Sequence, residues 1–99
     1  MERPFLGTDL KFIIEIESPG FDMGRDDFEV LLEGGEGSVL LHKEDMVHDE
    51  NNKWYICFDT KDLGVGLIRA TVTAHVPDDD FEDGIRDEVD KYVIADIRD

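Results

Sequence analysis

The segment from Val76 to Val89, VPDDDFEDGIRDEV, concentrates the side chains of this sequence that are best suited to bind a cation or a basic partner. It holds seven acidic residues and one glycine, between two segments that alternate like β-strands. Carboxylate oxygens are the ligands that Ca²⁺ prefers. The segment could therefore be a calcium loop, a loop that recognises a basic protein, or a solvated hairpin.

The calcium loop of a helix–loop–helix motif needs oxygen ligands at positions one, three, five and twelve, with glycine at position six. If Gly84 is placed at position six, Asp79 and Asp83 fall at positions one and five. Phe81 then falls at position three, where it offers no side-chain oxygen, and the flanking segments resemble strands instead of helices. The motif therefore fails. A looser calcium site stays open as an alternative, and its ligands would be Asp78, Asp80, Asp83 and Asp87.

We expect the loop to be a mobile hairpin that presents acids to a basic protein partner and steers its association electrostatically. Phe81 and Ile85 are expected to fold back onto the domain, and Arg86 to be shared among neighbouring carboxylates. No metal site and no cofactor is predicted. The residues predicted to form the partner-binding loop are Asp78, Asp79, Asp80, Asp83, Arg86 and Asp87.

Residues suited to catalysis do not occur in a recognisable arrangement. His42, His48 and His75 are not spaced as a zinc-binding pair. The single Cys57 lies among apolar neighbours in a predicted strand, which does not favour a reactive thiolate. The GGEG segment lacks the Lys and the Ser or Thr of a phosphate-binding loop. We therefore predict that the protein is not an enzyme.

Length and charge limit the classes of partner. A chain of 99 residues fits one domain, residues 1–99, with one hydrophobic core. It carries 26 acidic and 10 basic side chains, a formal net charge of −16. Such a charge repels phosphates and anionic lipid head groups, so nucleic acid and membranes are not expected as partners. Cations and basic protein surfaces are the partners that fit this charge.

The elements that carry these residues are predicted from two-residue alternation, the pattern of half-buried strands. It is clear in residues 11–17, 27–33 and 67–76, and WYICF at 54–58 adds a further strand. The glycines of GGEG favour a tight hairpin. The residues predicted to share one core are Ile14, Val30, Trp54, Phe58 and Val72.

Three further features complete the predicted fold. An irregular edge or a short strand is expected at Met46 to His48, and Leu63 is expected to plug one end of the domain. In the last segment, EVDKYVIADI, one side of a strand is predicted to carry Val89, Val93, Ala95 and Ile97. Many short strands without a long helix are typical of an all-β fold. We predict an immunoglobulin-like antiparallel two-sheet sandwich of six to seven strands.

Residues 57–89 carry a series of motifs: FDT at the end of an aromatic strand, an LGxG turn, a strand ending in VPD, and DGxRxEV at the start of the last strand. The series resembles small immunoglobulin-like domains encoded in prophages and mobile elements of Gram-negative gut bacteria. They are similar in outline to the N-terminal domain of the phage baseplate upper protein.

The resemblance implies a phage-derived structural or assembly module that acts through protein–protein contacts. Its partners would be copies of itself or other tail or baseplate components. The protein would be cytoplasmic before assembly and then part of the virion. The alternative function is a carbohydrate-binding or adhesive module that uses the acidic loop with calcium.

Overall fold

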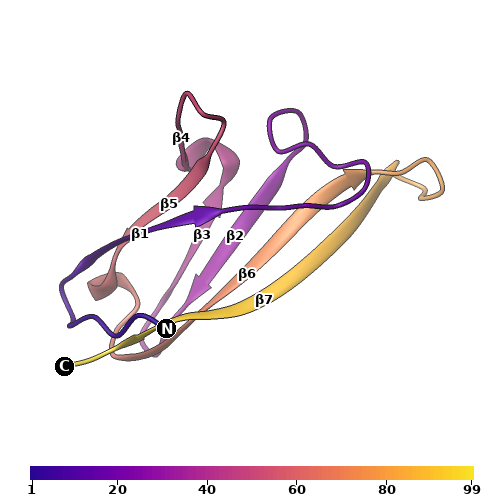
Figure 1. The fold of residues 1–99 in the computed structure, drawn as a ribbon. Coiled ribbons are helices and arrows are strands. Elements are labelled where there is room, and N and C mark those ends of the chain that lie inside the picture. Colours follow the sequence, from indigo (N-terminus) through magenta and orange to yellow (C-terminus); the bar gives the residue numbers. More distant parts are fainter.

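The computed structural model describes all 99 residues, which form seven β-strands and two short 3₁₀ helices (Figure 1). The strands of the first sheet are β1 (Asp9–Ile14), β4 (Val47–His48) and β5 (Trp54–Asp59). The strands of the second sheet are β2 (Phe28–Glu33), β3 (Ser38–His42), β6 (Gly66–Pro77) and β7 (Ile85–Ile97). The 3₁₀ helices are η1 (Lys43–Asp45) and η2 (Thr60–Asp62).

The strands build two antiparallel sheets that pack face to face. One sheet has the order β1-β5-β4 and the other the order β3-β2-β6-β7. This arrangement confirms the predicted all-β sandwich of two antiparallel sheets with seven strands. Strands β1 and β7 lie at the edges of their sheets, and β6 and β7 run the full length of the molecule (Figure 1).

The core lies between the sheets and follows the predicted alternation. In β2, Phe28, Val30 and Leu32 are completely buried, while the residues between them face outward. Val30, Trp54, Phe58 and Val72 belong to one cluster of buried side chains, and the half-buried Ile14 packs against it. The five residues predicted to share a core therefore do so. The predicted short strand is also present as β4, after η1.

Leu63 closes one end of the sandwich, as predicted. Its side chain is completely buried. The hairpin between β2 and β3 covers it, because the backbone N–H of Glu36 donates a hydrogen bond of 3.0 Å to the carbonyl oxygen of Leu63.

Strand β1 differs in extent from the predicted segment 11–17. It begins at Asp9, because Leu10 pairs with Phe58 of β5 and is buried. It ends at Ile14, which pairs with Trp54. Trp54 is the first residue of β5, so β5 offers no partner for residue 15. Residues 15–17 continue beyond the paired region with a half-buried Ile16.

The prediction that four residues of the last strand share one face is correct for two of them and wrong for the other two. Ala95 and Ile97 are buried, but Val89 and Val93 are 53% and 41% exposed. The pairing register explains the difference. Ile68 of β6 pairs with Ala95, and the next residue of β6 pairs with Val93. Ile94 therefore has no partner in β6 and is an extra residue in β7. Such a β-bulge shifts the alternation by one residue. Val89 and Val93 therefore lie on the outer face of the sheet.

Asp26, in the loop between β1 and β2, is a buried carboxylate whose charge is locally compensated. The guanidinium of Arg25 donates to both carboxylate oxygens over 2.9 Å, and the Asp22 N–H donates a third hydrogen bond of 2.9 Å. The hydrogen bonds from Arg25 are the main cause that lowers the pKa of Asp26 to about 2.

A lowered pKa in the folded state predicts how Asp26 contributes to acid stability. The contribution is complete above the unfolded pKa of about 3.9 and is lost as the pH falls toward 2. We expect the variant Asp26→Asn to be less stable than the wild type at pH 7 and to lose less stability between pH 4 and 2. Urea unfolding at each pH measures this difference. The control is Asp27→Asn, which removes the same charge from an exposed neighbour; identical pH profiles for the two variants would contradict the assignment.

Candidate functional site

The acidic loop is a closed connection between β6 and β7. The N–H of Asp78 donates to the carbonyl oxygen of Gly84 over 2.9 Å. The carboxylates of Asp78 and Asp83 accept hydrogen bonds of 3.0 and 3.1 Å from the N–H groups of Asp80 and Ile85. Aspartate favours turns through such bonds to the backbone two residues ahead. Two of the predicted binding acids therefore stabilise the loop itself.

The six residues predicted to form the partner-binding loop divide between two faces of the β6–β7 hairpin. Arg86 forms ion pairs with Asp78 and with Glu88, which confirms that it is shared among carboxylates. Asp87 points to the other face, where its carboxylate lies 2.7 Å from Nδ1 of His75. The exposed members in the loop itself are Asp79, Asp80 and Asp83.

The prediction that Phe81 and Ile85 fold back onto the domain is wrong. Their exposed fractions are 47% and 40%. Strands β6 and β7, with 12 and 13 residues, are about twice as long as β1, β2 and β5, with six each. The loop between them therefore projects beyond the end of the sandwich, where no other strand offers a surface to pack on (Figure 1).

The acidic side chains do not converge on one point. No group of three or more His, Cys, Asp or Glu side chains has an arrangement that could hold a metal ion. The histidines lie apart: His48 stacks on Trp54 with ring centroids 3.9 Å apart, whereas His42 and His75 flank Glu29 on the outer face of the larger sheet.

The fold contains no apolar helix of the length that a membrane span requires.

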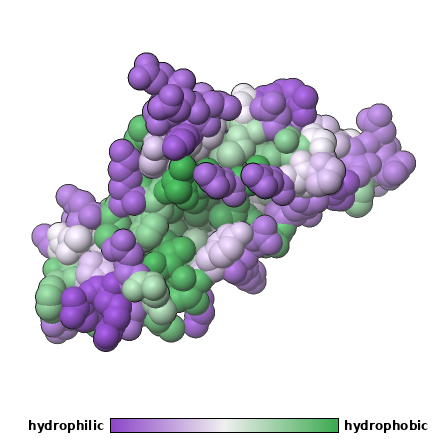
Figure 2. All heavy atoms as spheres, viewed as in Figure 1, coloured by the Kyte–Doolittle hydropathy of each residue, from purple (hydrophilic) through white to green (hydrophobic).

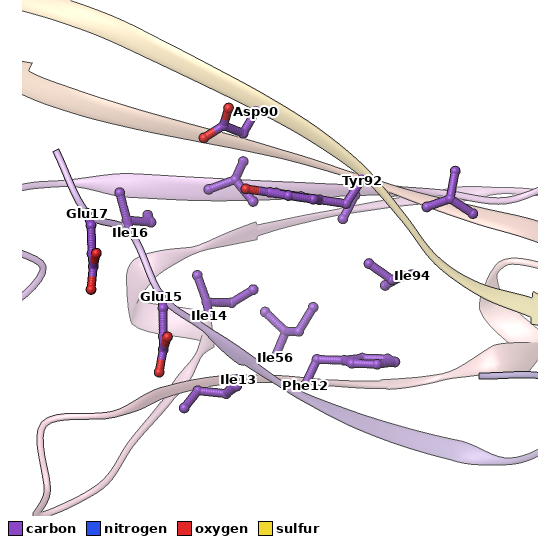
Figure 3. Close-up of a pocket in the computed structure, with 13 residues that line it drawn as sticks. Phe12, Ile13, Ile14, Glu15, Ile16, Glu17, Ile56, Asp90, Tyr92 and Ile94 are labelled. Atoms are coloured by element: carbon purple, nitrogen blue, oxygen red, sulfur yellow. The ribbon is translucent and has the colours of Figure 1, made fainter. Parts of the chain in front are cut away.

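The most pronounced concave feature is a groove between the edge strands β1 and β7, which the sequence did not reveal. It has a volume of about 560 Å³. Figure 2 shows hydrophobic side chains gathered in a hollow in the middle of this face, with hydrophilic residues around it. Its apolar walls, drawn in Figure 3, are formed mainly by Phe12, Ile14, Ile16, Ile56, Tyr92 and Ile94.

The bulge in β7 shapes one wall of this groove. Because the alternation shifts at Ile94, Tyr92 and Asp90 lie opposite Ala70 and Val72 of β6, on the face that points toward the core. Their partners in β6 are buried, but Tyr92 is 52% exposed. The edge of the larger sheet thus ends in a tyrosine and a carboxylate where an uninterrupted strand would place Val93 and Lys91.

The border of the groove is acidic. Asp90 borders it on the β7 side (Figure 3). Glu15 and Glu17 follow β1 on the other side, and their carboxylates point away from the groove. No lysine or arginine lines it. The groove therefore combines an apolar floor with one bordering carboxylate, and two more lie on the outer side of its β1 wall.

Comparison of the chain with protein-family models, curated proteins and solved structures gave no match. The chain's own geometry, above all the groove and the strand edges beside it, is what bears on its function.

Proposed function

We propose that this protein is a non-enzymatic structural or assembly module that acts through protein–protein contacts. The observation that carries the proposal is the apolar groove between two edge strands, β1 and β7. Edge strands present unpaired N–H and C=O groups, which most proteins cover or protect. An apolar groove beside such edges is suited to a polypeptide partner, because the partner can use both backbone hydrogen bonds and apolar side chains.

The resemblance of residues 57–89 to phage-encoded immunoglobulin-like domains supports a narrower version of this proposal. The partner is then another tail or baseplate component, and the protein passes from the cytoplasm into the virion. The alternative, carbohydrate binding through a calcium-loaded acidic loop, has less support, because no three carboxylates are arranged to hold a metal ion.

The protein-binding function can be tested by site-specific photo-crosslinking in the cells that naturally produce the protein. The aromatic crosslinker benzoylphenylalanine replaces Tyr92 in the groove or, as a control, the exposed Val47 in β4 at the far edge of the smaller sheet. We expect one defined protein, identified by mass spectrometry, to be linked through position 92 and not through position 47. Absence of any linked protein at position 92, or the same products at both positions, would contradict the proposal.

A further inference from the structure

The free edge of β7 already pairs with an extended segment over its last residues. Residues 2–6 run parallel to it, and Glu2 and Phe5 form bridges with Ala95 and Arg98. The N–H of Asp96 donates to the carbonyl oxygen of Glu2 over 2.9 Å. From Ile85 to Ile94, in contrast, β7 has only β6 as a partner. The end of β7 thus already pairs with an added segment on its outer edge. The same edge of residues 85–94 has no strand partner and is free to pair with another segment.

The opposite side of the groove also offers unpaired backbone. Strand β1 pairs only with β5, and its partners end at Ile14. The backbone groups of residues 15–17, which follow directly and border the groove, form no hydrogen bonds with any other backbone group of the chain. An extended segment lying in the groove would meet unpaired backbone groups on both sides.

The side chains of the groove suit alternate residues of such a segment. In a strand, residues i and i+2 point to the same side and lie roughly 7 Å apart. A groove of about 560 Å³ holds the side chains of a few residues, and its walls are apolar at Ile14, Ile16 and Ile94. An alternating segment paired with β7 would place apolar side chains against these walls and its other side chains toward solvent on the outer face of the larger sheet.

The charges select among the occupants that this shape allows. A second copy of the chain would bring a further net charge of −16 to a protein that already carries −16, at a groove bordered by Asp90. An anionic lipid would meet the same repulsion. A basic segment is instead attracted by this negative charge.

We propose that the groove between β1 and β7 binds an extended, basic segment of a partner protein, whose backbone pairs with the free edge of β7 and whose alternate apolar side chains enter the groove. This inference rests on the protein-binding function proposed above and adds the binding mode and the chemistry of the partner.

Three synthetic nine-residue peptides test the binding mode by calorimetry and by NMR of the backbone amides. One alternates Lys with Val, one alternates Lys with Ser, and one alternates Glu with Val. We expect the Lys/Val peptide to bind with one-to-one stoichiometry and at least about tenfold more tightly than the other two. The amide shifts should concentrate at residues 15–17 and 86–94. Equal binding of the Lys/Ser peptide, or shifts centred on residues 78–84, would show diffuse attraction to the acidic surface and overturn the inference.

Two variants on the same strand localise the binding. Tyr92→Arg places a positive charge inside the groove, whereas Val89→Arg places the same charge on the outer face of β7. We expect Tyr92→Arg to weaken binding of the Lys/Val peptide at least about tenfold, and Val89→Arg no more than about threefold. Asp90→Asn, which adds no volume, should also weaken binding and serves if Tyr92→Arg does not fold. Equal effects of the two arginines would overturn the inference.

The peptide and crosslinking experiments can fail independently. If the Lys/Val peptide does not bind but a protein is linked through position 92, strand insertion is wrong and the protein-binding function stands. If the peptide binds in the groove and no protein is linked in cells, the binding chemistry stands and the assembly function is contradicted.

Discussion

Replacing Trp54 with alanine is expected to lower the free energy of unfolding by about 3 to 5 kcal/mol, as truncation of a large buried aromatic side chain does. Trp54 is only 7% exposed and lies where β5 faces the larger sheet. Its ring meets Phe28 edge-on, with centroids 5.5 Å apart, and stacks on His48. Alanine would remove contacts with both neighbours and leave a cavity between the sheets.

Urea unfolding followed by circular dichroism measures this loss, because Trp54 is the only tryptophan and the variant has no tryptophan fluorescence. The matched control is Trp54→Phe. The indole N–H is buried without a hydrogen-bond partner, so phenylalanine loses no hydrogen bond and keeps an aromatic ring beside Phe28. We expect Trp54→Phe to cost less than half as much as Trp54→Ala. A loss below about 1 kcal/mol for Trp54→Ala would show that the ring does not support the core.

The features that the sequence predicted are those whose cause is local. Alternation in residues 27–33 and 67–76 identified the buried side of β2 and most of β6, because successive side chains of a strand point to opposite faces. The turn after β5 also has a local cause: the carboxylate of Asp59 accepts a hydrogen bond of 2.9 Å from the N–H of Lys61. Aspartate favours such turns in any context, so a few neighbouring residues suffice to predict it.

The features that the sequence did not predict depend on which strands become neighbours. One extra residue, Ile94, reverses the faces of β7, yet EVDKYVIADI contains apolar residues in both registers and fits either. The groove depends further on the order of strands in both sheets, because it exists only where the edges β1 and β7 face each other. Its two sides come mainly from residues 12–17 and 90–94, more than 70 positions apart in the chain.

The acidic loop shows the same division between local and distant causes. Its density of carboxylates is plain in the sequence, whereas Asp78 and Asp83 were predicted to bind a partner and not to form the turns that they stabilise. Arg86 and Asp87 lie on opposite faces because β7 already begins at Ile85, and pairing with Val76 and His75 decides that Arg86 faces inward and Asp87 outward. A loop that appears continuous in sequence is therefore two surfaces in the structure, and only the surface with Arg86 lies on the groove side of β7.

A second large effect is expected at Gly34, in the hairpin between β2 and β3. A Cβ atom at this position would lie 2.2 Å from the carbonyl oxygen of Leu63 and 2.7 Å from its Cβ. Leu63 cannot retreat, because its side chain is completely buried and its N–H donates a hydrogen bond of 3.1 Å to Thr60. We expect Gly34→Ala to lower the free energy of unfolding by about 3 kcal/mol or more, measured by urea unfolding.

The control for this prediction is Gly84→Ala in the acidic loop, which separates steric overlap from backbone strain. Gly84 has a φ of +76°, and a Cβ added there meets no atom within 4 Å. Alanine at position 84 should therefore cost only the strain of the left-handed conformation, about 1 to 2 kcal/mol. Gly34→Ala should be the more harmful variant, because the overlap forces the hairpin away from Leu63 and opens the end of the core. If Gly34→Ala proved no worse than Gly84→Ala, the hairpin would not pack tightly on Leu63, and closure of this end would have to come from other residues.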